Sequence, residues 1–214
     1  LINAVYFKGA WTTRFEKKNT RSGDFRRADG STQQVQMMNL KDTFRCASSN
    51  VCDYLEMDYG NHAFSMVIML PKDGKTTRDA MAALDGQTWA KAMESLAEAY
   101  VIVKLPRFKA ECEYPMHEHI LPDMGMKLPF NPMLADLSGI ADISAFGRLF
   151  ISSVIHKTFV QVDEEGTEAA GITLVGIENS VKSSFFIVDH PFLFVIREKS
   201  TDVILFIGEI GEIQ

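Results

Sequence analysis

Short apolar runs alternate with polar turns along most of the chain, and this pattern predicts strands. Residues 64–70 are apolar at nearly every position, which is typical of a strand covered on both faces. The turn Pro71-Lys72-Asp73-Gly74 ends that run, and residues 54–57 are expected to form a neighbouring strand. Further strands are expected at residues 1–7, 99–109, 151–162, 185–196 and 203–210.

One long segment has a helical period instead. Residues 77–98 carry apolar side chains at helical spacing, namely Met81, Leu84, Trp89, Met93 and Leu96. Asp85-Gly86 interrupts them and predicts two helices rather than one. A second, shorter helix is expected within residues 113–126. The fold class is therefore α+β, dominated by strands and with a β-rich C-terminal end.

Composition narrows the class of protein. With 214 residues, 46% of them apolar and 23% charged, the chain falls in the range of soluble globular proteins. The net charge of -6 argues against nucleic acid as a partner. No apolar run approaches the roughly 20 residues that a membrane-spanning helix needs. The three cysteines are too few for a disulfide scaffold and are not closely paired as in a zinc site, so they leave the compartment open.

The first residues, 1–7, have the pattern of a strand from the interior of a fold. They include no initiator Met, no signal peptide and no polar lead-in. A terminal strand of this kind has nothing upstream to brace it. We therefore expect the chain to be part of a longer protein, with any targeting signal outside this sequence.

Candidate catalytic residues do not form a recognisable site. The Gly-x-Ser-x-Gly turn of many serine hydrolases is missing, and Ser138 is interpreted as an ordinary loop serine. His117 and His119 would point to different sides of a helix, which favours a solvated helix face over a metal site. Gly208 and Gly211 lack the full dinucleotide-binding pattern. The sequence predicts no catalytic residue, no metal and no cofactor.

Residues 163–171, Asp-Glu-Glu-Gly-Thr-Glu-Ala-Ala-Gly, are the most unusual segment. By composition alone they would be a flexible surface loop. However, no proline occurs from Glu164 to His190, and proline is excluded from central strands. Alternate positions are also uncharged, with Glu168 and Glu178 in the opposite register; the uncharged set is Thr167, Ala169, Gly171, Thr173, Val175 and Ile177. The segment thus has the properties of both a loop and a strand.

Residues 154–171, Val-Ile-His-Lys-Thr-Phe-Val-Gln-Val-Asp-Glu-Glu-Gly-Thr-Glu-Ala-Ala-Gly, closely resemble the strand and hinge that precede the reactive loop of serpins. Residues 186–196 are similar to the C-terminal signature of that family, and residues 3–11, Asn-Ala-Val-Tyr-Phe-Lys-Gly-Ala-Trp, to the central strand of its large sheet. Residues 105–108 and 135–140 also match. The resemblance extends over essentially the whole chain and keeps the family's order.

This resemblance implies a serpin fold, with a large mixed β-sheet and β-barrel-like sheets at the C-terminal end. Residues 1–214 would be the C-terminal portion of a single serpin domain, with a reactive loop at about residues 164–184. The helical N-terminal half would be missing, so that the large sheet would expose its inner face. We expect that the chain does not fold stably alone.

The resemblance also implies a serine protease inhibitor that acts as a suicide substrate rather than an enzyme. The protease cleaves the loop and forms an acyl-enzyme, and the loop inserts into the large sheet as a new strand. A dozen inserted residues would release on the order of 10 kcal/mol. A non-inhibitory carrier or chaperone of the same family is the alternative, and a serine hydrolase is a weaker one. An extracellular or cell-surface location is favoured.

Site residues follow from the same resemblance. Asn3 and His156 resemble a hydrogen-bonded pair that controls opening of the sheet, Arg107 would pair with Glu164 at the base of the loop, and Trp11 would pack over this region. The cleaved bond is placed at Ser180-Val181, which suits an elastase-like protease, or at Lys182-Ser183, which suits a trypsin-like one. The hinge comprises Glu164, Glu165, Gly166, Thr167, Glu168, Ala169, Ala170 and Gly171.

Overall fold

A computed structural model describes residues 1–140, 149–167 and 184–214, with only the backbone described at Thr167. The chain divides into two compact units. Unit 1 combines Leu1–Phe7 with Glu111–Val160, and unit 2 combines Lys8–Ala110 with Gln161–Gln214.

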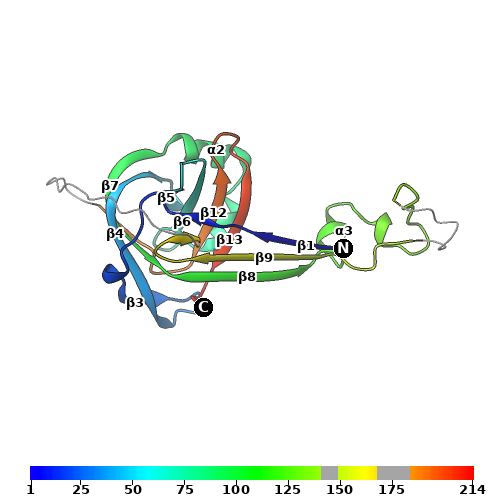
Figure 1. The fold of residues 1–214 in the computed structure, drawn as a ribbon, viewed down its shortest axis with the longest axis horizontal. Helices are drawn as coiled ribbons and strands as arrows, with labels where there is room; N and C mark the ends of the chain where they lie inside the picture. The colour runs from blue at the N-terminus through cyan, green and yellow to red at the C-terminus, as the bar shows by residue number, and fades with distance from the viewer. Residues whose placement is uncertain (141–148, 168–183) are drawn as a thin grey trace. The chain divides into compact units, whose positions relative to one another are not determined.

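A three-stranded sheet lies mostly in unit 1 and has the strand order β1-β9-β8, formed by Ile2–Tyr6, Ile155–Val162 and Phe108–Pro115 (Figure 1). The start of β8, before Glu111, and the end of β9, after Val160, belong to unit 2. The parallel pairing of β1 with β9 sets Asn3 opposite His156. Lys157 on β9 forms an ion pair of 2.7 Å with Glu113 on β8. Unit 1 also contains α3 (Ile120–Asp123) and the 3-10 turn η2 (Leu128–Phe130).

The prediction of a helix within residues 113–126 is wrong over most of that range. The chain continues as β8 through Pro115, and only Ile120–Asp123 is helical. Pro115 and Pro122 lack the N–H that a continuous helix would need, and Gly125 takes a φ of 102° just after the short helix. The charged residues Glu111 and Glu113 lie on the exposed part of β8 instead.

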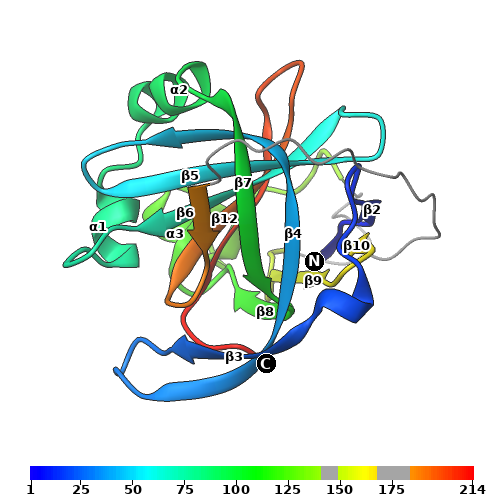
Figure 2. The same cartoon turned by 90° about the vertical axis from the view of Figure 1, so that its left-hand side faces the viewer.

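Unit 2 is built on an eight-stranded mixed sheet (Figure 2). Its strand order is β11-β7-β4-β5-β6-β12-β13, and β3 also pairs with β4. The bounds are β3 Arg21–Arg26, β4 Thr32–Ser48, β5 Cys52–Tyr59, β6 Phe64–Pro71, β7 Ala97–Pro106, β11 Ser184–Ile187, β12 Phe192–Glu198 and β13 Ile204–Ile210. β11 is parallel to β7, and the other pairs are antiparallel. Within the described ranges no sheet closes into a barrel.

Two expectations for strands needed correction. The strand expected at residues 185–196 is divided into β11 and β12, because Pro191 cannot donate to a ladder and the strands pair with different neighbours. The segment 99–109 ends as β7 at Pro106, and the next strand, β8, begins at Phe108. The neighbouring strands expected near residues 54–57 and 64–70 are confirmed as β5 and β6.

The break at Asp85-Gly86 is confirmed. α1 spans Thr77–Ala82 and begins with a capping box between Thr76 and Asp79, whereas α2 spans Gly86–Glu94 and is capped by the Asp85 side chain. Trp89 and Met93 of α2 are buried in a cluster with residues of β5, β6 and β12, which include Tyr54, Val67, Met69, Leu193 and Val195.

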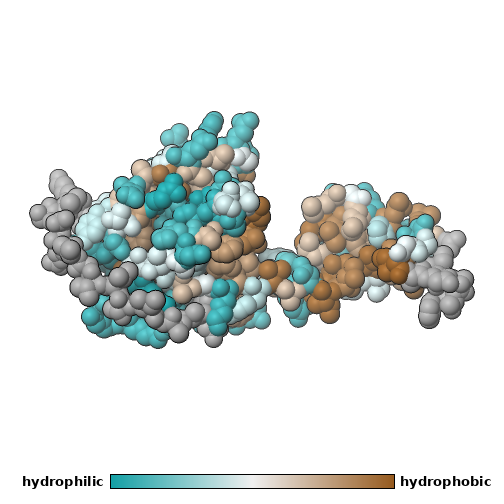
Figure 3. All heavy atoms as spheres, turned by 45° about the horizontal axis from the view of Figure 1, so that its top comes forward, coloured by the Kyte–Doolittle hydropathy of each residue, from teal (hydrophilic) through white to brown (hydrophobic). Residues whose placement is uncertain are grey.

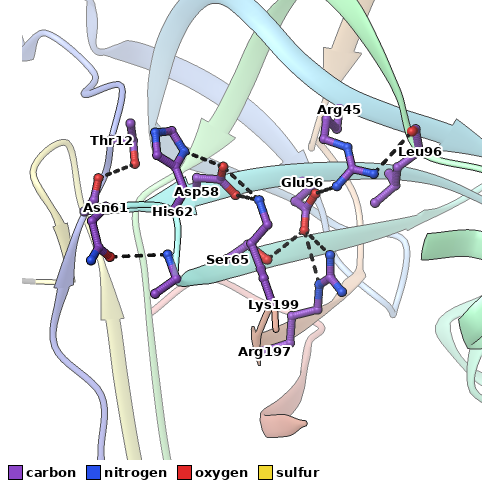
Figure 4. A network of polar contacts seen from close by, with 12 residues as sticks. Thr12, Arg45, Glu56, Asp58, Asn61, His62, Ser65, Leu96, Arg197 and Lys199 are labelled. Carbon is purple, nitrogen blue, oxygen red and sulfur yellow. Dashed lines mark hydrogen bonds and ion pairs between the residues drawn. The ribbon is translucent and has the colours of Figure 1, made fainter. Parts of the chain in front are cut away.

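A buried ionic network joins four strands of this sheet (Figure 4). Glu56 on β5 accepts hydrogen bonds from Ser65 Oγ on β6 at 2.8 Å and from Arg197 Nη2 on β12 at 2.5 Å. Its other carboxylate oxygen lies 2.8 Å from Arg45 Nη1 on β4. Both charges of the Glu56–Arg197 pair are buried, so each stabilises the other as its most buried counter-charge.

Further polar contacts lie around Asp58, near the end of β5, and extend to Thr12 in the segment that follows β1 and β2. The Asp58 carboxylate accepts hydrogen bonds from Lys199 Nζ at 2.7 and 3.0 Å and lies 2.7 Å from His62 Nδ1. The Asp58 carbonyl accepts a hydrogen bond from the Thr12 amide at 2.9 Å. The eight-stranded sheet therefore holds in place residues 9–15, the segment that contacts the predicted hinge.

Candidate hinge site

The predicted hinge begins in unit 2 as a backbone held on one side by residues 9–15. β10 (Gly166–Thr167) pairs antiparallel with β2 (Gly9–Ala10). The Trp11 amide donates to the Glu165 carbonyl at 3.0 Å, and the Phe15 amide donates to the Glu164 carbonyl at 3.1 Å. Main-chain hydrogen bonds thus fix the position of residues 164–167.

Glu164 has a buried side chain at the base of the predicted loop, with a relative exposure of 1%. Arg107 Nε lies 2.9 and 3.0 Å from its two carboxylate oxygens, and Arg107 Nη2 lies 2.5 Å from one of them. Thr20 Oγ1 donates a further hydrogen bond to this carboxylate at 2.5 Å. Burial works to raise the pKa of Glu164, but the hydrogen bonds from Arg107 and Thr20 hold it below its ordinary value. The site therefore stabilises the carboxylate form.

Trp11 joins the hinge to the eight-stranded sheet. Its indole stacks on Tyr59 of β5 with ring centroids 4.4 Å apart and an interplanar angle of 12°. The indole Nε1 donates to the Asp163 carbonyl at 3.0 Å. The side chain is buried, so this hydrogen bond satisfies a donor that is removed from water.

Gly166 is required by its surroundings. Its φ is 119°, a conformation that residues with a Cβ rarely adopt. A Cβ at this position would lie 2.4 Å from the Gly9 carbonyl oxygen and 2.5 Å from the Trp11 amide nitrogen. Only glycine fits between the hinge and β2 in this state.

The remaining predicted pair lies in unit 1. Asn3 Nδ2 on β1 is 3.2 Å from His156 Nδ1 on β9, and both residues are exposed or half-exposed. The expected contact is therefore present, while its role in sheet opening stays a prediction. The other two residues assigned to sheet opening contact the hinge directly, Trp11 through its backbone amide and Arg107 through its side chain.

Besides β2, sequence reasoning missed the hinge contacts of Phe15, Lys17 and Thr20. Lys17 Nζ lies 2.9 Å from Glu165 Oε1. Lys17 belongs to a mixed-charge segment that has the composition of an ordinary solvated surface. Its partner is 148 residues away in the sequence, so no local spacing connects the two.

Several predicted residues lie outside the described part of the chain. These are the hinge residues Glu168, Ala169, Ala170 and Gly171, and the candidate cleavage positions Ser180, Val181, Lys182 and Ser183. Their assignments stay predictions. Among the residues that are described, no helix is long and apolar enough to cross a membrane, and no group of histidine, cysteine and acidic side chains gathers at a metal-binding spacing.

Comparison with known proteins identifies the family. Residues 1–213 match the family model described as serpin (serine protease inhibitor), and the chain belongs to this family. It is 40% identical to leukocyte elastase inhibitor A of Rattus norvegicus, over 98% of this chain and 57% of that protein. It is 37% identical to intracellular coagulation inhibitor 1 of Tachypleus tridentatus, over 99% of this chain and 51% of that protein.

Solved structures agree with this assignment. The native state of the thermophilic serpin tengpin matches 99% of this chain and 55% of its own, with a TM-score of 0.87 and 31% identity. Uncleaved ovalbumin matches 99% of this chain and 53% of its own, with a TM-score of 0.85 and 28% identity. The chain thus spans just over half the length of the relatives it matches, and the predicted serpin fold is confirmed for this portion.

Proposed function

We propose that the complete protein inhibits a serine protease as a suicide substrate, with the segment that follows Gly166 as the bait. The pairing of β10 with β2 carries this proposal. It holds the start of the hinge in a short ladder of two residues. Because that ladder is so short, few of its backbone hydrogen bonds would be lost if the following segment entered a sheet.

The sequence beyond this anchor supports the same function. The uncharged register from Thr167 to Ile177 would let one face of an inserted strand be buried without charge. Relatives that bear inhibitor names, among them leukocyte elastase inhibitor A, are similar over nearly the whole chain. A carrier or chaperone function, the alternative within the family, would not need this register.

The complete protein, mixed with elastase or with trypsin, should form a covalent complex that survives denaturing electrophoresis. Thr167→Arg should abolish the complex and leave a cleaved protein, because insertion would bury an unpaired charge. Glu168→Arg is the matched control, since position 168 has the opposite parity and already carries a charge. An unchanged complex yield in Thr167→Arg would contradict the proposal.

The same experiment identifies the target protease and the bond that it cleaves. Cleavage at Ser180-Val181 would indicate an elastase-like partner, and cleavage at Lys182-Ser183 would indicate a trypsin-like one. Mass spectrometry of the released C-terminal peptide distinguishes the two bonds. Cleavage without any trapped protease would favour the non-inhibitory alternative, and turnover of a peptide or ester substrate would favour a hydrolase.

A second partner would be the N-terminal portion of the same serpin. The curated relatives are nearly twice as long as this chain, and unit 1 exposes many apolar side chains (Figure 3). Burial of that surface would stabilise the complete domain. An extracellular or cell-surface location stays a prediction that the relatives do not support, since one of them is named an intracellular inhibitor.

A further inference from the structure

Residues 11–20 form a strap along the start of the hinge. Two of its contacts are main-chain hydrogen bonds, from the Trp11 amide to Glu165 and from the Phe15 amide to Glu164. Two more are made by side chains, because Thr20 binds the Glu164 carboxylate and Lys17 binds the Glu165 carboxylate. The strap therefore holds each of the two consecutive glutamates by one backbone and one side-chain contact.

The two carboxylates are held in different surroundings. Glu164 is buried against Arg107, whereas Lys17 and Glu165 have side chains that are 68% and 42% exposed. The hydrogen bond to Glu165 raises the pKa of Lys17, and the same contact lowers the pKa of Glu165. Asp163 and Glu164 add further negative potential around the lysine. An ion pair exposed on both sides is screened by dissolved salt, whereas the Glu164–Arg107 pair is screened less because its carboxylate is buried, although the Arg107 side chain is 43% exposed.

We propose that Lys17 is a positioning residue whose exposed ion pair with Glu165 holds the hinge on the strap and makes its release sensitive to ionic strength. Its consequence for protease trapping rests on the proposed function, but the opening of the hinge does not. Exposed pairs of this kind change an opening equilibrium by about two- to five-fold. Lys17 would thus tune a release that is mainly opposed by Arg107 and its contacts with the buried Glu164 carboxylate.

The strap contains a matched control. Lys18 Nζ lies 2.8 Å from Glu16 Oε2, and these side chains are also exposed, at 78% and 53%. This neighbouring pair has the same charges, and both lysines lie in the 3-10 turn η1 (Lys17–Asn19). However, it joins two residues of the strap to each other. Lys18→Gln therefore removes an equivalent charge without releasing the hinge.

Hydrogen exchange of the Trp11 and Phe15 amides in the complete protein measures release directly, because both donate to hinge carbonyls. At low salt, about 20 mM, Lys17→Gln should speed their exchange about two- to five-fold. At about 500 mM salt the difference from wild type should disappear. Lys17→Arg, which keeps the charge, should exchange as the wild type does.

A double-mutant cycle identifies the partner. Glu165→Gln should speed exchange as much as Lys17→Gln does, and the double variant should add nothing further. The proposal is overturned if Lys17→Gln exchanges at the wild-type rate at low salt. It is equally overturned if Lys18→Gln speeds exchange as much, or if the two single effects add.

Protease titration gives the functional arm. Faster release of the hinge should lower the number of inhibitor molecules consumed per protease trapped, in Lys17→Gln but not in Lys18→Gln. If no protease is trapped by any form, the proposed function fails while the exchange result still decides the role of Lys17. If trapping occurs and exchange responds as expected but the ratio stays constant, the effect of Lys17 on inhibition is contradicted.

Discussion

Gly166 is the residue at which the hinge backbone comes nearest to its neighbour. We expect Gly166→Ala to break the pairing of β10 with β2, because its Cβ would collide with backbone atoms of Gly9 and Trp11 and its φ of 119° would be strained. The free energy of unfolding of the complete protein should fall by about 1–3 kcal/mol, which urea denaturation measures as a lower unfolding midpoint. Gly211→Ala is the control, since its Cβ would meet only an ordinary contact with Ala28 at 3.8 Å. Equal midpoints for the two variants would contradict this account.

Glu164 should make stability depend on pH. Its pKa in the folded protein is lower than the ordinary value of 4.5, so the unfolded chain binds its proton more tightly than the folded one does. The stabilisation is therefore fully present above about pH 4.5 and is lost as the pH falls through the folded-state pKa. The unfolding free energies of wild type and Glu164→Gln should differ most at pH 7 and converge in acid. A difference that stays constant down to pH 3 would show that the ionised carboxylate is not what stabilises the hinge.

Strands of unit 2 are joined by charges as well as by ladders. Arg197 on β12 is the main counter-charge of buried Glu56 on β5, and it also contacts Asp202. Arg197→Met should destabilise the complete protein by about 3 kcal/mol, because it leaves the buried Glu56 carboxylate with only the half-exposed Arg45 as a counter-charge. Adding Glu56→Gln should recover part of that loss. Urea unfolding tests both, with Lys18→Met as the control because Lys18 and Glu16 form an exposed pair of 2.8 Å.

Helices and strands whose ends are determined by neighbouring residues were predictable from the sequence. The break between α1 and α2 depends on Asp85 and Gly86 themselves, since the Asp85 side chain caps the second helix. β4 has no such signal. Its 17 residues alternate polar and apolar over only part of their length, and the strand is stabilised by its long ladder with β7. Its local pattern therefore does not mark the length of the strand.

At the scale of the whole molecule, the candidate site was predictable only where a known family supplies it. Arg107 and Glu164 are 57 residues apart, and the resemblance alone suggested that they pair. Lys17 and Thr20 contact the same two glutamates from 148 and 144 residues away, and nothing in their local sequence marks them. Contacts of this range depend on how the eight-stranded sheet positions the strap, which no spacing of residues encodes.

Unit 1 shows why this portion should depend on the rest of a serpin domain. Among its described residues, Val160 is the one apolar side chain that is fully buried. Many large apolar side chains are exposed instead: Leu1, Ile2, Tyr6, Tyr114, Ile120, Met124, Met126, Leu128, Met133, Leu134, Ile140 and Phe150. Apolar surface of this kind lowers the free energy of a fold only when something covers it.

The 214-residue chain produced alone should therefore bind the dye ANS strongly and unfold without a cooperative transition in unit 1. Adding the N-terminal portion of the same protein, as a separate polypeptide, should suppress dye binding and restore a cooperative transition, because it would bury the exposed apolar residues. A serum albumin at equal concentration is the control for nonspecific coverage. Cooperative unfolding of the isolated chain without dye binding would mean that unit 1 is stabilised by contacts within the chain itself, and the N-terminal portion would then not be needed for its fold.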